Sequence, residues 1–316
     1  MTAMKKNQLL AMILILSAVG CTEEDMSECS KKVKENTIVH FSLKDQANNQ
    51  IFTTIVGNVM LFVYDTDGNL VTQKAVSKSE LNIFSGTRLQ LEPGAYKMSA
   101  WANYSSQYTN FHIDGGKPCF DLDHNYLINA VPENGVIADG DPLYHAPKTK
   151  GDMFPVTVPA EGEVEVIAEF RNAHIKMEIT VEGYGVVPTR IAGDPLTIEI
   201  TNITSRYCLG MIPFGEKVSY IGQAPNVDFD TKIFRILFHV PLFDRSTDTE
   251  ILISNSAGRL IIVPIVLREL LGDKIELDEI LHLPIKIVFT EENGLLQGTV
   301  VVDLPEWGEG DVEPYI

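Results

Sequence analysis

The run VGNVMLFVY at residues 56–64 decides how this chain folds. It is of strand length, strongly apolar and rich in β-branched and aromatic residues, which is typical of a β-strand. DTDGN follows at residues 65–69, and LVT at 70–72 leads away from it. Asp-Gly between two such runs predicts a hairpin, because glycine tolerates a positive φ. A calcium loop also begins with aspartates, but this stretch lacks the ligand spacing and distal glutamate of an EF-hand, so we interpret it as a plain turn.

Short runs of the same kind recur along the rest of the chain, several of them alternating between apolar and polar residues. The further predicted strands are 37–43, 88–91, 96–101, 154–158, 164–169, 175–181, 196–203, 233–240, 250–254, 259–263, 284–289 and 296–304. Residues 103–123 are polar and irregular and are predicted to be loops. Pro264–Leu271 is the one good helical candidate, with proline in its first turn and Gly272 just past its end.

Many short strands with almost no amphipathic helix predict an all-β protein built from antiparallel β-sandwiches. The length of 316 residues accommodates two such domains in tandem. We place the boundary near Gly162, which gives an N-terminal sandwich over 36–162 and a C-terminal sandwich over 163–316. No period of 20–50 residues repeats, which disfavours a solenoid or propeller.

The first residues predict an export signal with a lipid attachment site. Two lysines precede the apolar run LLAMILIL at 9–16, and small residues then lead to Cys21. The run is too short for a membrane-spanning helix, which needs about 20 residues. We therefore predict a signal peptide over 1–20, cleavage before Cys21, a diacylglyceryl group on its thiol and a lipidated acidic tether over 21–35. An ordinary signal peptide or an uncleaved anchor, with Cys21 incidental, is the alternative.

Charge limits the partners. The whole chain carries −18, and removal of residues 1–20 takes two lysines with it, leaving −20. A surface this acidic repels phosphate backbones and anionic headgroups, so we expect no nucleic acid partner. Contact with the outer membrane would come from the lipid alone.

The cysteines leave the disulfide state open. If Cys21 is acylated, three remain in an oxidising compartment: Cys29, Cys119 and Cys208. A Cys29–Cys119 disulfide is our preference because both lie in the first half, but the absence of any disulfide is equally compatible with the spacing. Without a C-x-x-C pair, a structural zinc site is not expected.

Catalytic signals are missing from the sequence. None of the seven histidines forms an H-E-x-x-H pair, no G-x-S-x-G elbow presents a serine, and no Gly-rich loop follows a strand. His40, His174 and His239 fall in strand-like runs, where we expect structural, hydrogen-bonded histidines. Asp139-Gly140-Asp141 is interpreted as a turn and Trp101 as a core residue. We therefore predict no enzymatic activity, no metal and no cofactor.

An ordered set of short segments resembles a known family. These segments are Asp25-Met26-Ser27-Glu28-Cys29, Val59–Gly68, Leu91–Tyr96 with Ala100–Asn103, Pro142–His145, and Trp307 near the C-terminus. In this order they resemble the FimB-type fimbrial anchor family, the fimbrillin-related lipoproteins of type V pili.

The resemblance implies two transthyretin-like β-sandwiches, no catalytic residues, and a lipid-held subunit. Such a subunit attaches a pilus to the outer membrane, limits its length, and docks to a stalk subunit through strands. It also implies that the first strand, near Thr37–Leu43, stays in place. No arginine lies between Cys21 and Leu43, although Lys31, Lys32 and Lys34 leave a lysine-specific cut open.

Two further questions stay open at this stage. The C-terminal run 295–304 is a candidate donor or edge strand, with a normal internal strand as the favoured interpretation. A surface glycan-binding lipoprotein of a nutrient-uptake system, with an exposed aromatic platform at Trp101, and a fimbrial tip or adhesin subunit are the alternative functions.

Overall fold

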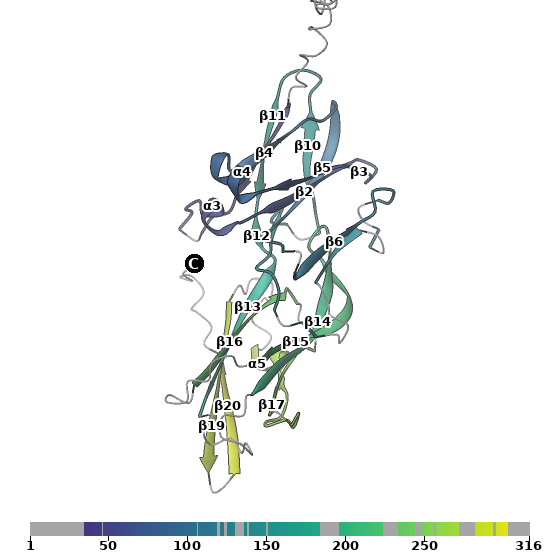
Figure 1. The fold of residues 1–316 in the computed structure, drawn as a ribbon. Helices are drawn as coiled ribbons and strands as arrows, with labels where there is room; N and C mark the ends of the chain where they lie inside the picture. Colours follow the sequence, from purple (N-terminus) through teal and green to yellow (C-terminus); the bar gives the residue numbers. More distant parts are fainter. Residues whose placement is uncertain are drawn as a thin grey trace, which may run out of the picture.

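The computed structural model describes residues 35–302 except 46, 106, 119–120, 123–124, 130–135, 138, 150, 184–195, 224–232, 244–247, 256, 272–281 and 293–294. The described chain is all-β apart from three short helices, as the sequence predicts. Its strands form two β units placed end to end in an elongated molecule (Figure 1). No described helix has the length and apolarity to span a bilayer.

The first unit contains two facing sheets. One sheet has the order β11-β1-β4, and the other has the order β12-β9-β5-β2-β3 with β10 also paired to β5. Their strands are β1 (Thr37–Ser42), β2 (Val59–Asp65), β3 (Leu70–Val76), β4 (Gly86–Leu89), β5 (Gly94–Ala102), β9 (Tyr144–Ala146), β10 (Phe154–Val158), β11 (Val164–Glu169) and β12 (Arg171–Asn172). Two short helices, α3 (Phe52–Ile55) and α4 (Lys78–Ile83), lie beside them.

The second unit is a second pair of sheets. One has the order β16-β13-β19-β20; the other has the order β18-β17-β14-β15-β8, and β7 joins it through β14 and pairs with β6. Their elements are β6 (Thr109–Ile113), β7 (Asn125–Asn129), β8 (Val136–Ile137), β13 (His174–Glu182), β14 (Thr197–Cys208), β15 (Pro213–Gln223), β16 (Ile233–Pro241), β17 (Glu250–Ser254), β18 (Ile265–Val266), α5 (Leu267–Leu271), β19 (His282–Glu292) and β20 (Leu295–Val302). Most pairings are antiparallel; β1–β11, β13–β19 and β15–β8 are parallel.

The run at residues 56–64 is strongly apolar because β2, which it contains, is buried on both faces. Leu61 and Val63 belong to the core of the first unit. Phe62 and Tyr64 point to the other face and join a second core, which continues into the second unit. The ring of Phe62 lies 5.3 Å from the ring of Phe111 on β6. A strand covered on both sides loses the alternation that a half-exposed strand shows.

The turn after β2 is a hairpin turn, as predicted. One carboxylate oxygen of Asp65 accepts hydrogen bonds from the backbone N–H groups of Asp67 (2.9 Å) and Asn69 (2.8 Å), and the other accepts the Asn69 side-chain amide (2.9 Å). Gly68 has φ +88°, a conformation that glycine adopts without strain. The bonds to the Asn69 side chain and backbone lower the pKa of Asp65. Its carboxylate therefore closes the turn.

The change from one unit to the other comes later than the predicted boundary at 162–163. β11 follows Gly162, yet it pairs with β1 from Thr37↔Val164 to Ser42↔Glu169. Phe170, one residue further on, packs in the core of the first unit. The hairpin β6–β7 lies before the predicted boundary in the sequence but belongs to the second unit, because β7 pairs with β14. Alternation identified β11, but it did not show which sheet this strand joins.

Three local predictions differ from the structure. The stretch 103–123 contains β6 and is therefore not all loop, and 259–263 is not a strand but makes one isolated bridge, Ser254↔Leu260. The predicted helix is formed only over its second half, as α5, because Ile265 and Val266 pair with β17.

Helix α4 is an element that the sequence analysis missed. Its start carries a capping box: Ser77 Oγ accepts the backbone N–H of Glu80, and the Glu80 carboxylate accepts the backbone N–H of Ser77 at 2.8 Å. The sequence Ser-x-x-Glu at 77–80 is the signal for this cap.

Candidate docking site

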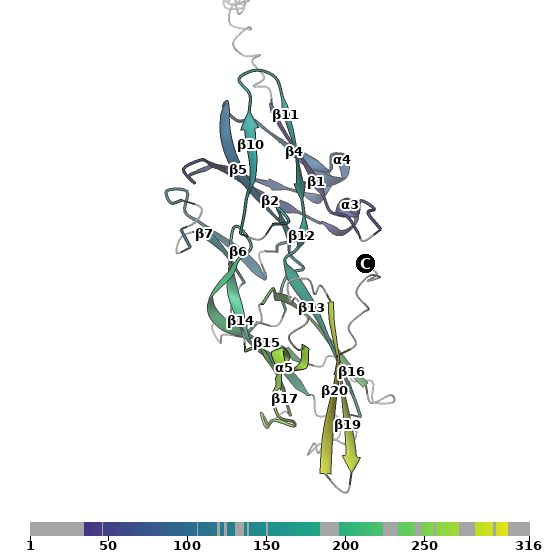
Figure 2. The ribbon, with the colours of Figure 1, turned by 180° about the vertical axis from the view of Figure 1, so that it is seen from behind.

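β1 is the central strand of its sheet, with β11 on one side and β4 on the other. Its inward side chains Val39 and Phe41 are 0% and 2% exposed. The ring of Phe41 lies 5.5 Å from that of Phe52 and 5.7 Å from that of Phe170. Figure 2 shows this sheet at the end of the molecule where the described chain begins. β1 is therefore an integral part of the first core.

The close approach of β4 to β1 requires a glycine. A Cβ on Gly86 would lie 2.1 Å from the backbone oxygen of Val39. Backbone atoms cannot move aside as a flexible side chain can, so any larger residue at 86 would push the two strands apart. The groove that β1 fills is shaped for this strand.

β20 lies at the edge of its sheet, at the other end of the molecule (Figure 1). It pairs with β19 from Ile285↔Val302 to Glu292↔Leu295. Among the described strands only β19 pairs with it, so within the described ranges β20 is an edge strand and not the internal strand that we favoured. The strand LLQGTVVV contains no charged residue and no proline, the residues that usually guard an exposed edge. Val301 on it is 46% exposed.

Trp101 cannot serve as an exposed sugar platform. Its side chain is 0% exposed, and its ring lies between those of His145 (4.7 Å) and Tyr207 (5.4 Å). The prediction that Trp101 is a core residue is confirmed. Trp307 lies outside the described residues.

The predicted structural histidines make structural contacts. His174 is 2% exposed, with Nδ1 2.9 Å from the Leu143 carbonyl oxygen, and burial lowers its pKa to about 4. His40 Nε2 lies 3.3 Å from a Glu165 carboxylate oxygen, and His239 Nδ1 lies 3.4 Å from Asp139. The sequence analysis did not single out His145, which is also fully buried with a pKa lowered by burial to about 4.

The carboxylates of Asp139 and Asp141 accept hydrogen bonds from backbone N–H groups. Asp139 accepts the backbone N–H groups of Gly140 and His239, each at 2.8 Å. Asp141 accepts the N–H of Ser105 at 2.7 Å, and burial raises the pKa of its carboxyl group. Among the described residues, no His, Cys, Asp and Glu side chains gather in a group that could hold a metal ion.

None of the three predicted site cysteines is among the described residues. Cys21, Cys29 and Cys119 lie outside the described residues, so lipidation and the Cys29–Cys119 disulfide stay predictions. Cys208 is described, half-buried and free, and its Sγ accepts the backbone N–H of Ile212 at 3.3 Å.

Comparisons with known proteins agree with this architecture. The family described as fimbrillin-A associated anchor proteins Mfa1 and Mfa2 matches residues 26–313. A search of curated proteins finds no match.

Solved structures share the fold at low sequence identity. The fimbrial anchor protein Mfa2 from Porphyromonas gingivalis matches with TM-score 0.62 and 17% identity, over 85% of this chain and 97% of that chain. A candidate adhesin from Bacteroides ovatus matches with TM-score 0.66 and 16% identity, over 86% and 93%. A candidate polysaccharide-binding protein from Bacteroides thetaiotaomicron matches with TM-score 0.65 and 15% identity, over 87% and 100%.

The family match spans most of the sequence and confirms the resemblance that the short motifs carried. The chain belongs to the family of fimbrillin-A associated anchor proteins Mfa1 and Mfa2.

Proposed function

We propose that this chain is a lipid-anchored fimbrial subunit that attaches a pilus to the outer membrane and limits its length. It docks to a stalk subunit by strand pairing, with a lipid on Cys21 holding it at the cell surface. Membership of the anchor family supports a fimbria-associated role. Beyond that role, we propose that the chain is lipidated, sits at the outer membrane, docks to the stalk subunit and controls the length of the pilus.

The position of β1 carries the proposal. β1 is the first described strand after the predicted lipid site, and it occupies the centre of the first sheet. An incoming strand therefore has no room between β4 and β11 while β1 is in place. A subunit whose groove is filled by its own tethered strand would end a chain of strand exchanges, which is how a filament would stop growing at the membrane.

The position of β20 at a sheet edge, among the described strands, supports docking by strand pairing. Pairing with an exposed edge adds a row of backbone hydrogen bonds, and neighbouring side-chain contacts give specificity. An uncharged edge at the end of the molecule away from β1 and β11 suits a protein partner better than a solvated role. Burial of Trp101 argues against glycan binding at that residue, so we do not extend the proposal to carbohydrate.

Deletion of the gene in a piliated strain tests the function as a whole. We expect fimbriae that are shed into the medium or longer than normal. Complementation with a Cys21→Ala variant should leave the subunit unlipidated and the fimbriae detached. Unchanged attachment and length after deletion would refute the anchoring role, and an unmodified Cys21 in the mature protein would refute the lipid.

Cross-linking tests the docking strand. A Val301→Cys variant carries its thiol on β20, and an Ile83→Cys variant carries one on α4, where the native side chain is 87% exposed. With a thiol-to-amine cross-linker on intact cells, we expect the fimbrial stalk subunit to be captured from residue 301 and not from residue 83. Equal capture from both positions, or none from 301, would contradict docking at β20.

A further inference from the structure

In the loop Leu209–Ile212 between β14 and β15, residues 209–211 are buried although they form a hairpin tip, and Ile212 is exposed. Leu209 and Met211 are both 0% exposed. Hairpin tips normally lie in solvent, because buried loop backbone needs hydrogen-bond partners. β14 rises from the second unit to the level of β12 in the first (Figure 2). The tip of this hairpin is therefore embedded where the two units meet.

Three segments of the first unit supply the partners that the loop needs. Ser99 Oγ on β5 donates to the Leu209 carbonyl oxygen at 2.7 Å, and His145 Nε2 on β9 lies 2.9 Å from the same oxygen. The backbone N–H of Gly151, between β9 and β10, donates to the Gly210 carbonyl at 2.6 Å. Ser99 and His145 are themselves 0% exposed. Because these donors are buried, water does not compete for them, and their hydrogen bonds to the loop are stronger than at the surface.

Ser99 and His145 together face the Leu209 carbonyl oxygen, and Ser99 makes the shorter contact. His145 Nδ1 lies 3.0 Å from the Pro147 carbonyl oxygen, so both ring nitrogens face carbonyl oxygens. A neutral imidazole has one N–H and can donate to only one of them. The Ser99 hydroxyl also lies 3.2 Å from His145 Nε2, but its shorter contact, at 2.7 Å, is to the Leu209 carbonyl oxygen.

The loop 209–212 packs closely against the backbone of the first unit at Gly151. A Cβ on Gly210 would lie 3.1 Å from the carbonyl carbon of Gly151 and 3.3 Å from its Cα. Met211 adopts φ +65°, a left-handed conformation that a non-glycine residue keeps only where its surroundings hold it in place. Both observations indicate a loop whose conformation is set by contact with the first unit.

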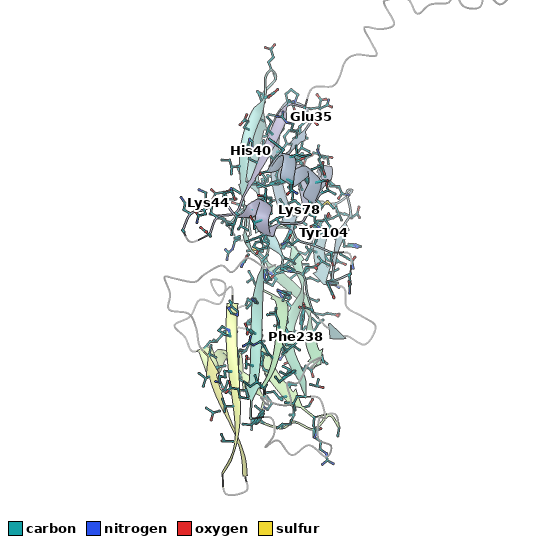
Figure 3. The ribbon with its side chains drawn as sticks, turned by 60° about the vertical axis from the view of Figure 1, so that its left-hand side comes forward. Glu35, His40, Lys44, Lys78, Tyr104 and Phe238 are labelled. Atoms are coloured by element: carbon teal, nitrogen blue, oxygen red, sulfur yellow. The ribbon has the colours of Figure 1, made fainter. Side chains whose placement is uncertain are left out.

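Below the loop, the contact continues through Tyr207. Its hydroxyl donates to the Ala173 carbonyl oxygen at 2.8 Å and accepts the backbone N–H of Leu242. Its ring lies 5.4 Å from that of Trp101 on β5. Figure 3 marks Tyr104 and Phe238 on the two units, one on either side of this junction.

We propose that residues 209–212 are an internal latch that locks the two β units into one rigid, cooperatively unfolding body. The chain passes between the units three times, after β5, after β8 and at Asn172–Ala173. The latch fixes the angle between the units, because its polar contacts reach β5, β9 and the segment after β9. If the proposed anchoring function holds, the latch carries filament load across the junction to the lipid.

Hydrogen exchange and calorimetry on the purified, detergent-solubilised full chain test the latch without any fimbriae. In Gly210→Ala, the new methyl group meets backbone and should expel the loop. We expect the Gly151 amide to exchange at least tenfold faster and the single thermal transition to split into two. Ser99→Ala, which removes only the hydroxyl, should speed the same amide to a smaller extent. Failure of these effects leaves the fimbrial proposal untouched.

Matched controls separate the latch from general destabilisation. Gly115→Ala places its Cβ no closer than 3.7 Å to another atom, and Ser79→Ala changes an exposed serine; both should exchange as wild type at Gly151. Unchanged exchange at Gly151 in both latch variants would overturn the proposal. So would faster exchange with a single transition whose calorimetric and van't Hoff enthalpies agree, since the units would then be coupled without the latch. Should Gly210→Ala not fold, Ser99→Ala decides on the same two criteria.

Discussion

Thr37 of β1 lies beside Val164 of β11 in a parallel pairing that joins the beginning of the described chain to a strand beyond the predicted domain boundary. A parallel pair needs a long connection, and here the connection is most of the first unit. The strand nearest the predicted lipid is thus held by the last long strand of that unit. This arrangement makes the integrity of the anchor end depend on β1.

Truncation of Phe41 should show how much β1 contributes. Phe41→Ala removes a ring that is 2% exposed and packed against two other phenylalanines. We expect a loss of about 3–5 kcal/mol in the free energy of unfolding, measured by urea denaturation. Ile167→Ala on the neighbouring β11, where the side chain is 63% exposed, should change it by no more than about 0.5 kcal/mol. Equal losses would mean that β1 is not a core strand.

The capping box of α4 makes a smaller, local contribution. Ser77→Ala removes the acceptor for the Glu80 N–H and should cost about 1 kcal/mol in the same assay. Asn82→Ala on an exposed position of the helix should cause no loss. A Ser77→Ala protein as stable as wild type would show that the packing of Leu81, and not the cap, starts this helix.

Stability should fall as the pH drops from about 6.5 to 4. The pKa of His145 and of His174 is lowered by burial from 6.5 to about 4, so between these values the unfolded chain binds protons that the folded chain does not. The stabilisation is fully present above pH 6.5 and is lost as the pH approaches 4, by about 3 kcal/mol per histidine.

Urea titrations between pH 6.5 and 4.5 measure this slope. His174→Gln should be less stable at pH 6.5 but should show a shallower fall with acid. His112→Gln, at an exposed histidine, should keep the wild-type slope. Parallel slopes for all three proteins would contradict the assignment to the buried imidazoles.

A charge on β20 should block docking without unfolding the protein. Val301→Lys places a cation on the open edge strand, where the native side chain is 46% exposed. We expect unfolding within about 0.5 kcal/mol of wild type and loss of fimbrial attachment at the cell surface. Val71→Lys is the matched control, since Val71 is also 46% exposed and lies on β3, the edge strand of another sheet. Loss of attachment in both variants, or in neither, would count against β20.

Much of the local structure could be predicted from sequence patterns. The apolar run at 56–64, the turn at 65–69 and the burial of Trp101 follow from composition, turn chemistry and alternation, all of which act over a few residues. The predicted strand 250–254 matches β17 to the residue. Cys21 and the acidic tether were predicted in the same way and stay predictions.

The partners of these strands were decided only by the tertiary structure. Alternation shows which face of a strand is buried, but backbone N–H and C=O groups are the same at every residue and carry no label for the neighbouring strand. The pairing of β1 with β11 and of β7 with β14 therefore appears only in the fold, which also decides between the two interpretations of β20 among the described strands. The same holds for the contact of Ser99 and His145 with Leu209, because hydrogen bonds between distant residues depend on where the packed sheets bring them together.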